Sequence, residues 1–495
     1  MKDYSFGNYI CALRTGLGYS QFQLGNLVGV TDKAVSKWEN GDAKPRLATC
    51  YRLADVLGVS VNELLSCEQF ITLSARKELD KMNKQLWLAA YEKLSLYGAY
   101  PPAICWSRLA AEEAALQGTD AIQGYAVLGK IKREALARHT AIIVCGTVGS
   151  SFAAWLLGGT EVNPLPPHYI CPKCGKAEFV QNVRDGFDLP PKQCDCGGEY
   201  LRDGHSIPFE GYAKAERSGT NIELRVSDTF KPIAVQILLD FYKGVAEVLP
   251  VMVQSEDNGW CVERYVVLPK QKAKPKVSED GFWYVDSDEY WQWQENETTF
   301  NFIIGKQLNA LEKLRDSTGI NPPNPQLCLT PQMAEALYRR RCERQAFITE
   351  QLSDVIPDFD LLLRVDLLSH ATGAWDGNGA QLLREGEANF RDIPAAREDI
   401  FNAIDMRLAQ NGIRDSGLAL LVMEKARKGL FYSQGMDSDV EKMVLTLGLP
   451  GWYPDYLKKI MYLFPKAHSV AYLLVDILLQ WYLERDPGIC AAGVK

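Results

Sequence analysis

Apolar residues recur at helical spacing through residues 1–67, in short blocks separated by glycine and by residues that cap helices. Ser20 and Thr31 precede the second and third blocks, and Gly29 and Gly41 follow them. The pattern predicts five short helices around one small core. The expected core side chains are Leu13, Leu24, Val28, Val30, Val35, Leu47, Leu53, Leu57, Val61 and Leu65.

The pattern of apolar residues predicts helices over residues 85–140 and changes after residue 140. A β-branched segment over residues 141–144 predicts a strand, and a loop of small residues over 146–151 leads into a helix. Such a loop can cradle phosphate because backbone N–H groups at a helix start point outward, although many ordinary turns look alike. The candidate phosphate-binding residues are Gly146, Thr147, Gly149, Ser150 and Ser151.

Length and composition limit the number of domains and the classes of protein that this chain can belong to. A chain of 495 residues is too long for one core, so we expect two to four domains. A net charge of −8 argues against a protein that coats nucleic acid by charge alone. The N-terminal residues do not follow the pattern of a secretion signal, and no run of about 18 apolar residues occurs. We therefore expect a cytoplasmic protein with no membrane span.

The string S-Q-x-x-L-x-x-x-V-G-V-x-x-x-x-V-S-K-W-E-N-G, over residues 20–41, resembles the phage-repressor-like Cro/C1 (XRE) family. The resemblance implies a helix-turn-helix domain that binds double-stranded DNA. It places Gln21 near phosphate, and it makes Trp38 and Glu39 structural residues that pack and tie their helix to the next turn. The residues implied to enter the major groove are Thr31, Asp32, Lys33, Ser36 and Lys37.

Charge over residues 1–67 is nearly balanced, with seven Lys and Arg against six Asp and Glu. One copy should therefore bind DNA weakly, which favours a homodimer on a two-fold site. The alternative is a helix-turn-helix fold that serves protein contacts only.

A second resemblance covers residues 85–487, where matching strings follow one another in order. They include GTVGSSFAAWLLGGTEVNPLPPHYICPKC, GFDLPPKQC, NIELRVSDTFKP, SHATGAWDGNGAQLL and PGWYPDYLKKIMYLFPKAHSVAY, and they resemble the PolC-type bacterial DNA polymerase III alpha subunit. The implied fold is multidomain: an all-α helix-turn-helix domain, an α+β palm-like domain with a zinc-ribbon-like insert, and a mainly α fingers-like domain. The expected boundaries are 1–67, a linker at 68–84, 85–325 with the insert at 168–205, and 326–495.

The catalytic carboxylates that the resemblance implies for the palm-like part are replaced in this sequence. Nucleotidyl transfer uses two metal ions bridged by carboxylates, which this family supplies as Asp-Ile-Asp-Leu on one strand. Here the strand has Asn221 and Glu223, and alternation puts both on one face. A neutral amide holds a hard cation poorly, and the longer Glu223 shifts its carboxylate by roughly 1 Å, which can cost on the order of 100-fold in rate. The third carboxylate position aligns with Asn301.

These substitutions predict a polymerase-like module without catalysis and without magnesium. Cys145 also replaces an arginine that the resemblance implies for binding triphosphate. The opposing interpretation is that Glu223 and Asp228 rebuild a metal site. Lys466 and His468 match a fingers motif that approaches nucleotide, but they could instead orient the helix expected over residues 470–483.

Two cysteine pairs, separated by 19 residues, predict a structural zinc site. The candidate ligands are Cys171, Cys174, Cys194 and Cys196. The second pair has C-x-C spacing, which is tighter than the resemblance implies, so His168 and His205 are alternative ligands. The other alternative is a set of reduced thiols without metal.

Three functions remain open from the sequence. The first is a sequence-specific DNA-binding protein, a transcriptional regulator, whose inactive module binds DNA, a nucleotide or a replication protein. The second is a divergent DNA-directed DNA polymerase. The third is a non-catalytic mimic that enters replication complexes.

Overall fold

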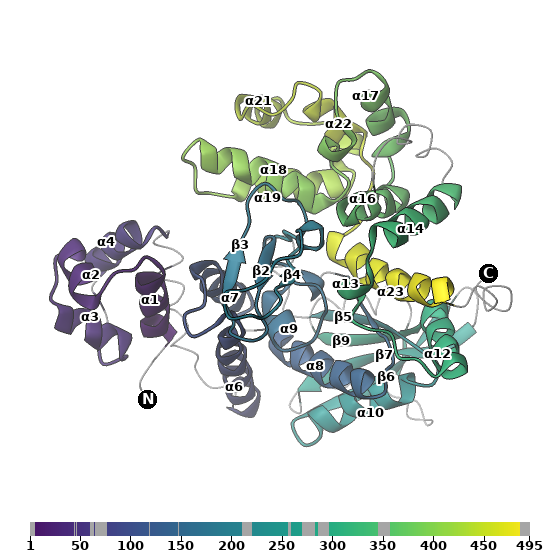
Figure 1. Ribbon diagram of the computed structural model, residues 1–495, viewed down its shortest axis with the longest axis horizontal. Coiled ribbons are helices and arrows are strands. Elements are labelled where there is room, and N and C mark those ends of the chain that lie inside the picture. Colours follow the sequence, from purple (N-terminus) through teal and green to yellow (C-terminus); the bar gives the residue numbers. More distant parts are fainter. Residues whose placement is uncertain are drawn as a thin grey trace.

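The computed structural model describes residues 5–43, 45, 47–59, 64, 77–117, 119–146, 148–209, 220–255, 259–269, 283–285, 297–344 and 357–485. A small helical domain lies at one side, next to a larger body that contains a mixed sheet (Figure 1). The coarse expectation of a helical N-terminal domain followed by an α/β region is confirmed. Among the described residues, no helix has the length and apolar content to cross a membrane.

The N-terminal domain forms around capped helices, as the sequence predicts. Its helices are α1 (Ser5–Gly16), α2 (Gln21–Val28), α3 (Asp32–Glu39) and α4 (Leu47–Leu57). The Ser20 hydroxyl accepts from Gln23 N (3.1 Å), and the Gln23 side chain accepts from Ser20 N (2.7 Å), which satisfies two exposed helix donors. Thr31 caps α3 by accepting from Ala34 N (3.2 Å), and Gly29 ends α2 in the left-handed region. The predicted fifth helix falls almost wholly outside the described residues.

The core of this domain contains most of the expected side chains. Buried as expected are Leu13, Leu24, Val28, Val35, Leu53 and Leu57, whereas Val30 is only partly buried. Leu47, Val61 and Leu65 have no described side chain. Besides Leu13, α1 adds Phe6, Tyr9 and Ile10 to this core, and these three residues were not expected.

The larger body begins with helices that lead into its sheet. These elements are α6 (Lys77–Lys93), η1 (Leu94–Tyr97), α7 (Ala103–Ala115), α8 (Ala121–Ala137), β1 (Ile143–Cys145), η2 (Val148–Ser150) and α9 (Phe152–Leu156). The strand expected at 141–144 therefore starts two residues later. Helix α6 also begins inside the expected linker at 68–84, so the last part of that segment is helical.

Six strands form the main sheet, in the order β1-β5-β9-β7-β6-β8. Their bounds after β1 are β5 (Asn221–Val226), β6 (Ala246–Ser255), β7 (Gly259–Pro269), β8 (Trp283–Val285) and β9 (Thr298–Ile304). Strand β5 is parallel to β9 and antiparallel to β1. Alternate residues of β5, such as Ile222 and Leu224, are buried in a core shared with α8 and α10 (Lys231–Tyr242). The opposite face of β5 therefore carries its polar residues.

A smaller sheet, in the order β3-β2-β4, lies in the expected insert at 168–205. Its strands are β2 (His168–Ile170), β3 (Ala177–Phe179) and β4 (Leu201–Asp203), and η3 (Gly186–Asp188) precedes β4. Both strand pairs are antiparallel.

The C-terminal part is helical. It contains α12 (Lys306–Thr318), α13 (Pro325–Cys328), α14 (Pro331–Arg344), α16 (Phe359–His370), η4 (Trp375–Gly379), α17 (Ala380–Arg384), η5 (Phe390–Asp392), α18 (Arg397–Gln410), α19 (Gly417–Arg427), α20 (Leu430–Gln434), α21 (Ser438–Thr446), α22 (Tyr453–Lys459) and α23 (Lys466–Arg485). The last helix starts four residues before the expected segment 470–483.

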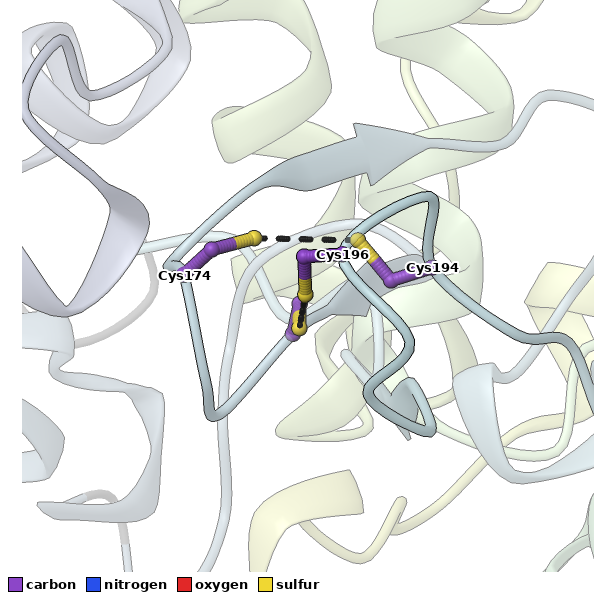
Figure 2. Close-up of side chains that lie close together, drawn as sticks. Cys174, Cys194 and Cys196 are labelled. Carbon is purple, nitrogen blue, oxygen red and sulfur yellow. Dashed lines mark hydrogen bonds between the residues drawn. The ribbon is translucent and has the colours of Figure 1, made fainter.

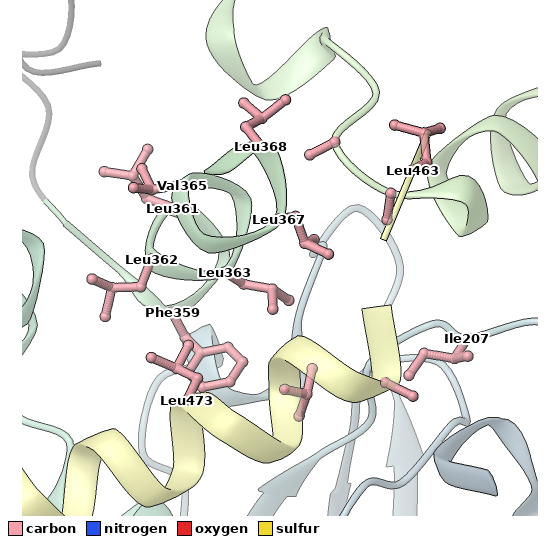
Figure 3. Close-up of a cluster of buried hydrophobic side chains, with 14 of the residues drawn as sticks. Ile207, Phe359, Leu361, Leu362, Leu363, Val365, Leu367, Leu368, Leu463 and Leu473 are labelled. Carbon is pink, nitrogen blue, oxygen red and sulfur yellow. The ribbon is translucent and has the colours of Figure 1, made fainter. Parts of the chain in front are cut away.

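Helix α23 joins the helical part to the sheet. Leu473 of α23 packs in one core with Phe359 and Leu363 of α16 (Figure 3). The same core includes Ile143 and Cys145 of β1. The predicted boundary at residue 325 therefore does not separate two independent cores.

Candidate DNA-binding helix, palm face and cysteine cluster

Helix α3 presents one polar face to solvent. Thr31, Asp32, Lys33 and Lys37 are exposed and Ser36 is half-buried, whereas Val35 and Trp38 are buried. An exposed face with two lysines and short polar side chains has the shape and donors that a major groove accepts. Asp32, Lys33, Ser36 and Lys37 therefore lie on the side of α3 opposite Val35 and Trp38, and Thr31 lies at its N-cap.

Glu39 fixes the end of α3 against the preceding helices. Its carboxylate accepts from Arg14 Nε (2.6 Å) and Nη2 (3.0 Å), and also from Gln21 Nε2 (2.6 Å). The Arg14 and Glu39 side chains are only 10% and 6% exposed, so water screens this ion pair little. Glu39 thus ties α3 back to α1 and α2, rather than to the following turn as the sequence analysis expected.

The three positions expected to replace the catalytic carboxylates come together on one face of the main sheet. Glu223 of β5 lies opposite Asn301 of β9, and Asn221 lies opposite Thr299. Asn301 Nδ2 and Thr299 Oγ1 each donate to Asn221 Oδ1 at 3.0 Å. Asn301 is only 6% exposed, and Thr299 is fully buried. The register therefore matches the expected third position at Asn301.

The set of Asn221, Glu223 and Asn301 contains one carboxylate and two neutral amides, whereas a two-metal site is built from several carboxylates. Because an amide N–H of Asn301 donates to the amide oxygen of Asn221, the two side chains attract each other without a cation. Arg225 lies two residues beyond Glu223 on the same face, and Arg264 of β7 lies opposite Asn301. The Arg225 guanidinium lies 5.6 Å from the centre of the Tyr472 ring. Arg225 and Arg264 thus place positive charge beside the Glu223 carboxylate.

Asp228, the other carboxylate considered for a metal site, is hydrogen-bonded to Asn309. It follows the end of β5, and its carboxylate accepts from Asn309 Nδ2 (2.6 Å), while its N–H donates to Asn309 Oδ1 (2.9 Å). Within the described ranges, the four cysteines are the only group of three or more Cys, His, Asp or Glu side chains close enough to share a metal ion. Glu223 and Asp228 therefore belong to no such group there.

The small-residue loop at 146–151 is occupied by side chains of the chain itself. Glu112, fully buried on α7, accepts from Phe152 N (2.7 Å), Ala153 N (3.0 Å) and Ser151 Oγ (2.7 Å). Arg108 Nε donates to the same carboxylate at 2.6 Å. The backbone donors that a phosphate would use at the start of α9 are thus already paired. The signal for this in the sequence was Arg108 and Glu112 at helical i,i+4 spacing.

Helix α23 covers the rest of this loop. Gly146 N donates to His468 Nδ1 (3.1 Å), and a Cβ at Gly149 would lie 2.8 Å from the Ala467 Cβ. The Ser150 hydroxyl is buried without a hydrogen-bond partner among the described residues. Thr147 lies outside the described residues. A nucleotide phosphate at this loop would therefore have to displace both Glu112 and α23.

Lys466 and His468 connect the start of α23 to neighbouring segments. Lys466 is 6% exposed, its Nζ donates to the His205 carbonyl (2.6 Å), and its backbone N donates to Glu398 (3.1 Å). Burial lowers the pKa of His468 to about 4, so its imidazole is neutral near pH 7 and can accept from Gly146 N. These contacts favour the interpretation that both residues orient α23.

The four cysteines gather at one end of the small sheet (Figure 2). All four sulfur atoms lie within 4.8 Å of one another, with Cys171 3.5 Å from Cys196 and Cys174 3.6 Å from Cys194. A tetrahedral zinc ion with Zn–S bonds of about 2.3 Å requires sulfur atoms about 3.8 Å apart. The cluster therefore has the donor set and size to hold a metal ion such as zinc.

Two similar turns produce this geometry despite their unequal spacing. Gly175 N donates to Cys171 O and Gly197 N donates to Cys194 O, both at 2.8 Å, and both glycines have positive φ (75° and 77°). The Cys196 N–H lowers the pKa of the Cys194 thiol to about 6, which favours the thiolate that a metal binds.

The two histidines considered as alternative ligands have other contacts. His168 Nδ1 donates to the Pro166 carbonyl (2.8 Å), and His205 pairs with Asp185 (2.8 Å). Neither histidine belongs to the four-cysteine group. The four cysteines therefore remain the candidate metal ligands.

Comparison with known proteins gives two matches. Residues 12–64 match the HTH_3 helix-turn-helix family. The chain is also similar to DNA polymerase III PolC-type of Bacillus cereus, at 27% identity over 78% of this chain and 31% of the relative. The protein of the same name from Listeria innocua is 26% identical over 79% of this chain, and that from Staphylococcus saprophyticus is 25% identical over 83%.

The N-terminal residues thus match a helix-turn-helix family, and most of the chain is similar to PolC-type DNA polymerase III. It spans about a third of the length of the PolC-type relatives that it matches. The HTH_3 match supports DNA binding by the N-terminal domain, and the PolC homology supports a polymerase-like module.

Proposed function

We propose that this protein recognises a specific duplex DNA site through α3 and carries a PolC-like module that does not polymerise DNA. The specificity would come from Thr31, Asp32, Lys33, Ser36 and Lys37 in the major groove, with Gln21 at the backbone phosphates. The exposed polar face of α3 supports this assignment.

The observation that carries the loss of catalysis is the hydrogen bond from Asn301 to Asn221. Two-metal catalysis needs negative ligands that remain uncompensated until the cations bind. Here a donor and an acceptor satisfy each other at those positions, and Arg225 shares their face.

We further propose that the cysteine cluster binds one structural zinc ion in a zinc-ribbon-like insert, and that residues 326–495 correspond to the fingers. Four sulfur ligands would close the coordination shell, which leaves no open position for a substrate. The zinc would hold the two turns together and keep the small sheet in place.

A regulatory role follows from these proposals. A protein that binds one site on DNA but cannot extend a primer acts by occupancy or by recruitment, so its partners would be duplex DNA and a component of the replication machinery. The dimer expected from the near-neutral charge of residues 1–67 belongs to the same proposal.

The test is primer extension on a templated duplex by the purified protein, with Mg²⁺ and then with Mn²⁺. We expect no incorporation with either ion. Incorporation that disappears in Glu223→Ala would refute the proposal and identify a targeted polymerase. In parallel, selection from random duplexes should enrich one sequence, and Lys33→Ala combined with Lys37→Ala should abolish that enrichment. Selection of no sequence would refute the assignment of α3.

A further inference from the structure

Helix α7 belongs to two hydrophobic cores at once. Cys105 and Leu109 pack in the core of the main sheet. On another side of the helix, Ala110 is 3% exposed and packs in the core of the helix-turn-helix domain, and Ala103 and Trp106 pack against that core. Figure 1 shows α7 at the side of the larger body that faces α1.

A polar contact accompanies this packing. The Tyr9 hydroxyl of α1 lies 3.3 Å from Ser107 Oγ of α7, and Tyr9 is 1% exposed. A buried tyrosine whose hydroxyl meets a polar group fixes the angle at which two helices meet. The contact with α7 is therefore directional as well as apolar.

Helix α1 in turn lies directly against the DNA-recognition helix. A Cβ at Gly7 would come within 2.4 Å of the Glu39 carbonyl oxygen and 2.5 Å of the Trp38 carbonyl oxygen. Arg14 of α1 pairs with the Glu39 carboxylate. The backbone of α1 thus supports the end of α3 with no side chain between them.

Helix α7 is also held firmly on the palm-like side. Arg108 donates to the Ile207 carbonyl (3.0 Å), and Glu112 holds the start of α9. A helix anchored on this side provides a rigid surface for a second domain on its other side.

We propose that α7 is a docking surface for the chain's own helix-turn-helix domain, and that it holds α3 in one orientation relative to the PolC-like module. DNA bound to α3 would then pass the module on one fixed side. The docking does not require that the module be inactive, and it does not depend on which DNA sequence is recognised.

The test compares two full-length variants that differ by one position on α7. Ala110→Glu buries a charge in the contact, whereas Ala111→Glu places the same side chain at an exposed position of the same helix. We expect Ala110→Glu to release an N-terminal fragment under limited trypsin at least tenfold faster than the wild type, and to raise the radius of gyration in solution scattering. Ala111→Glu should behave as the wild type in both measurements.

Folding is monitored by circular dichroism, which should match the wild type in both variants. If Ala110→Glu loses its native spectrum, Tyr9→Phe decides, because it removes only the hydroxyl that meets Ser107. We expect Tyr9→Phe to be cleaved two- to fivefold faster than the wild type. Wild-type cleavage and an unchanged radius in a folded Ala110→Glu, or wild-type cleavage of Tyr9→Phe, would overturn the docking proposal while leaving DNA recognition untouched.

Discussion

Replacing Glu112 by glutamine should destabilise the palm-like part strongly, because this carboxylate supports the loop before α9. It accepts from Arg108 Nε, Ser151 Oγ, Phe152 N and Ala153 N, and its side chain is fully buried. Glutamine keeps the shape but turns one acceptor into a donor, so an N–H group would face N–H and O–H donors.

The size of the effect follows from burial. Removing one charge of a buried ion pair costs about 3–5 kcal/mol, because the remaining charge stays in the interior without an opposite charge beside it. The chain offers a matched control in Glu134, which pairs with Arg138 at the same i,i+4 spacing but with side chains 39% and 53% exposed. An exposed pair of this kind contributes about 0.3–0.5 kcal/mol.

The assay is thermal unfolding of the full chain followed by circular dichroism and tryptophan fluorescence. A domain of this size loses about 2–4 °C in Tm per kcal/mol, so Glu112→Gln should lower the Tm of its transition by roughly 6–20 °C. Glu134→Gln should lower it by no more than about 2 °C. A Glu112→Gln protein no less stable than Glu134→Gln would refute the role assigned to this carboxylate.

Three further outcomes are expected. The purified protein should contain one zinc ion per chain by elemental analysis, and Cys174→Ser should lose it; full occupancy in that variant would refute the four-ligand assignment. Lys33→Ala and Lys37→Ala should each weaken binding to the selected duplex. If the lysine contacts a phosphate, its removal should also reduce the slope of log K against log salt by about 0.9. An unchanged slope would indicate that the lysine contacts a base. Asn221→Asp combined with Asn301→Asp should be less stable than the wild type without metal and should regain stability with Mn²⁺, because two carboxylates about 3 Å apart repel until a cation binds; stability independent of Mn²⁺ would show that the face cannot hold a metal.

The features of the fold that depend on a few neighbouring residues could be predicted from the sequence. Ser20 and Thr31 cap α2 and α3 because capping depends on residues three positions apart. The alternation of Asn221 and Glu223 follows from the two-residue period of a strand, and the cysteine pairs specify their own turns. These features need only a few consecutive residues.

The contacts that position the candidate sites were not predictable, because they join distant segments. Glu112 meets the start of α9 across about 40 residues of sequence, and Tyr9 meets Ser107 across 98. His468 reaches Gly146 across 322 residues. The loop of small residues predicts a phosphate-binding turn when only its own sequence is considered. In the structure, Glu112 and His468 accept hydrogen bonds from backbone N–H groups of this region, and both residues come from distant segments.

The hydrogen bond between Asn221 and Asn301 explains how this face of the main sheet can be stable without metal ions. The buried face of β5, with Ile222 and Leu224, makes the same core contacts whichever residues occupy the other face. A carboxylate cluster without metal would destabilise the sheet through repulsion, whereas the Asn221 and Asn301 amides hydrogen-bond to each other. Amides at these two positions therefore need no metal ion to avoid repulsion, and they leave the core contacts of Ile222 and Leu224 unchanged. The contact of α7 with α1 holds the helix-turn-helix domain against the body that contains this sheet.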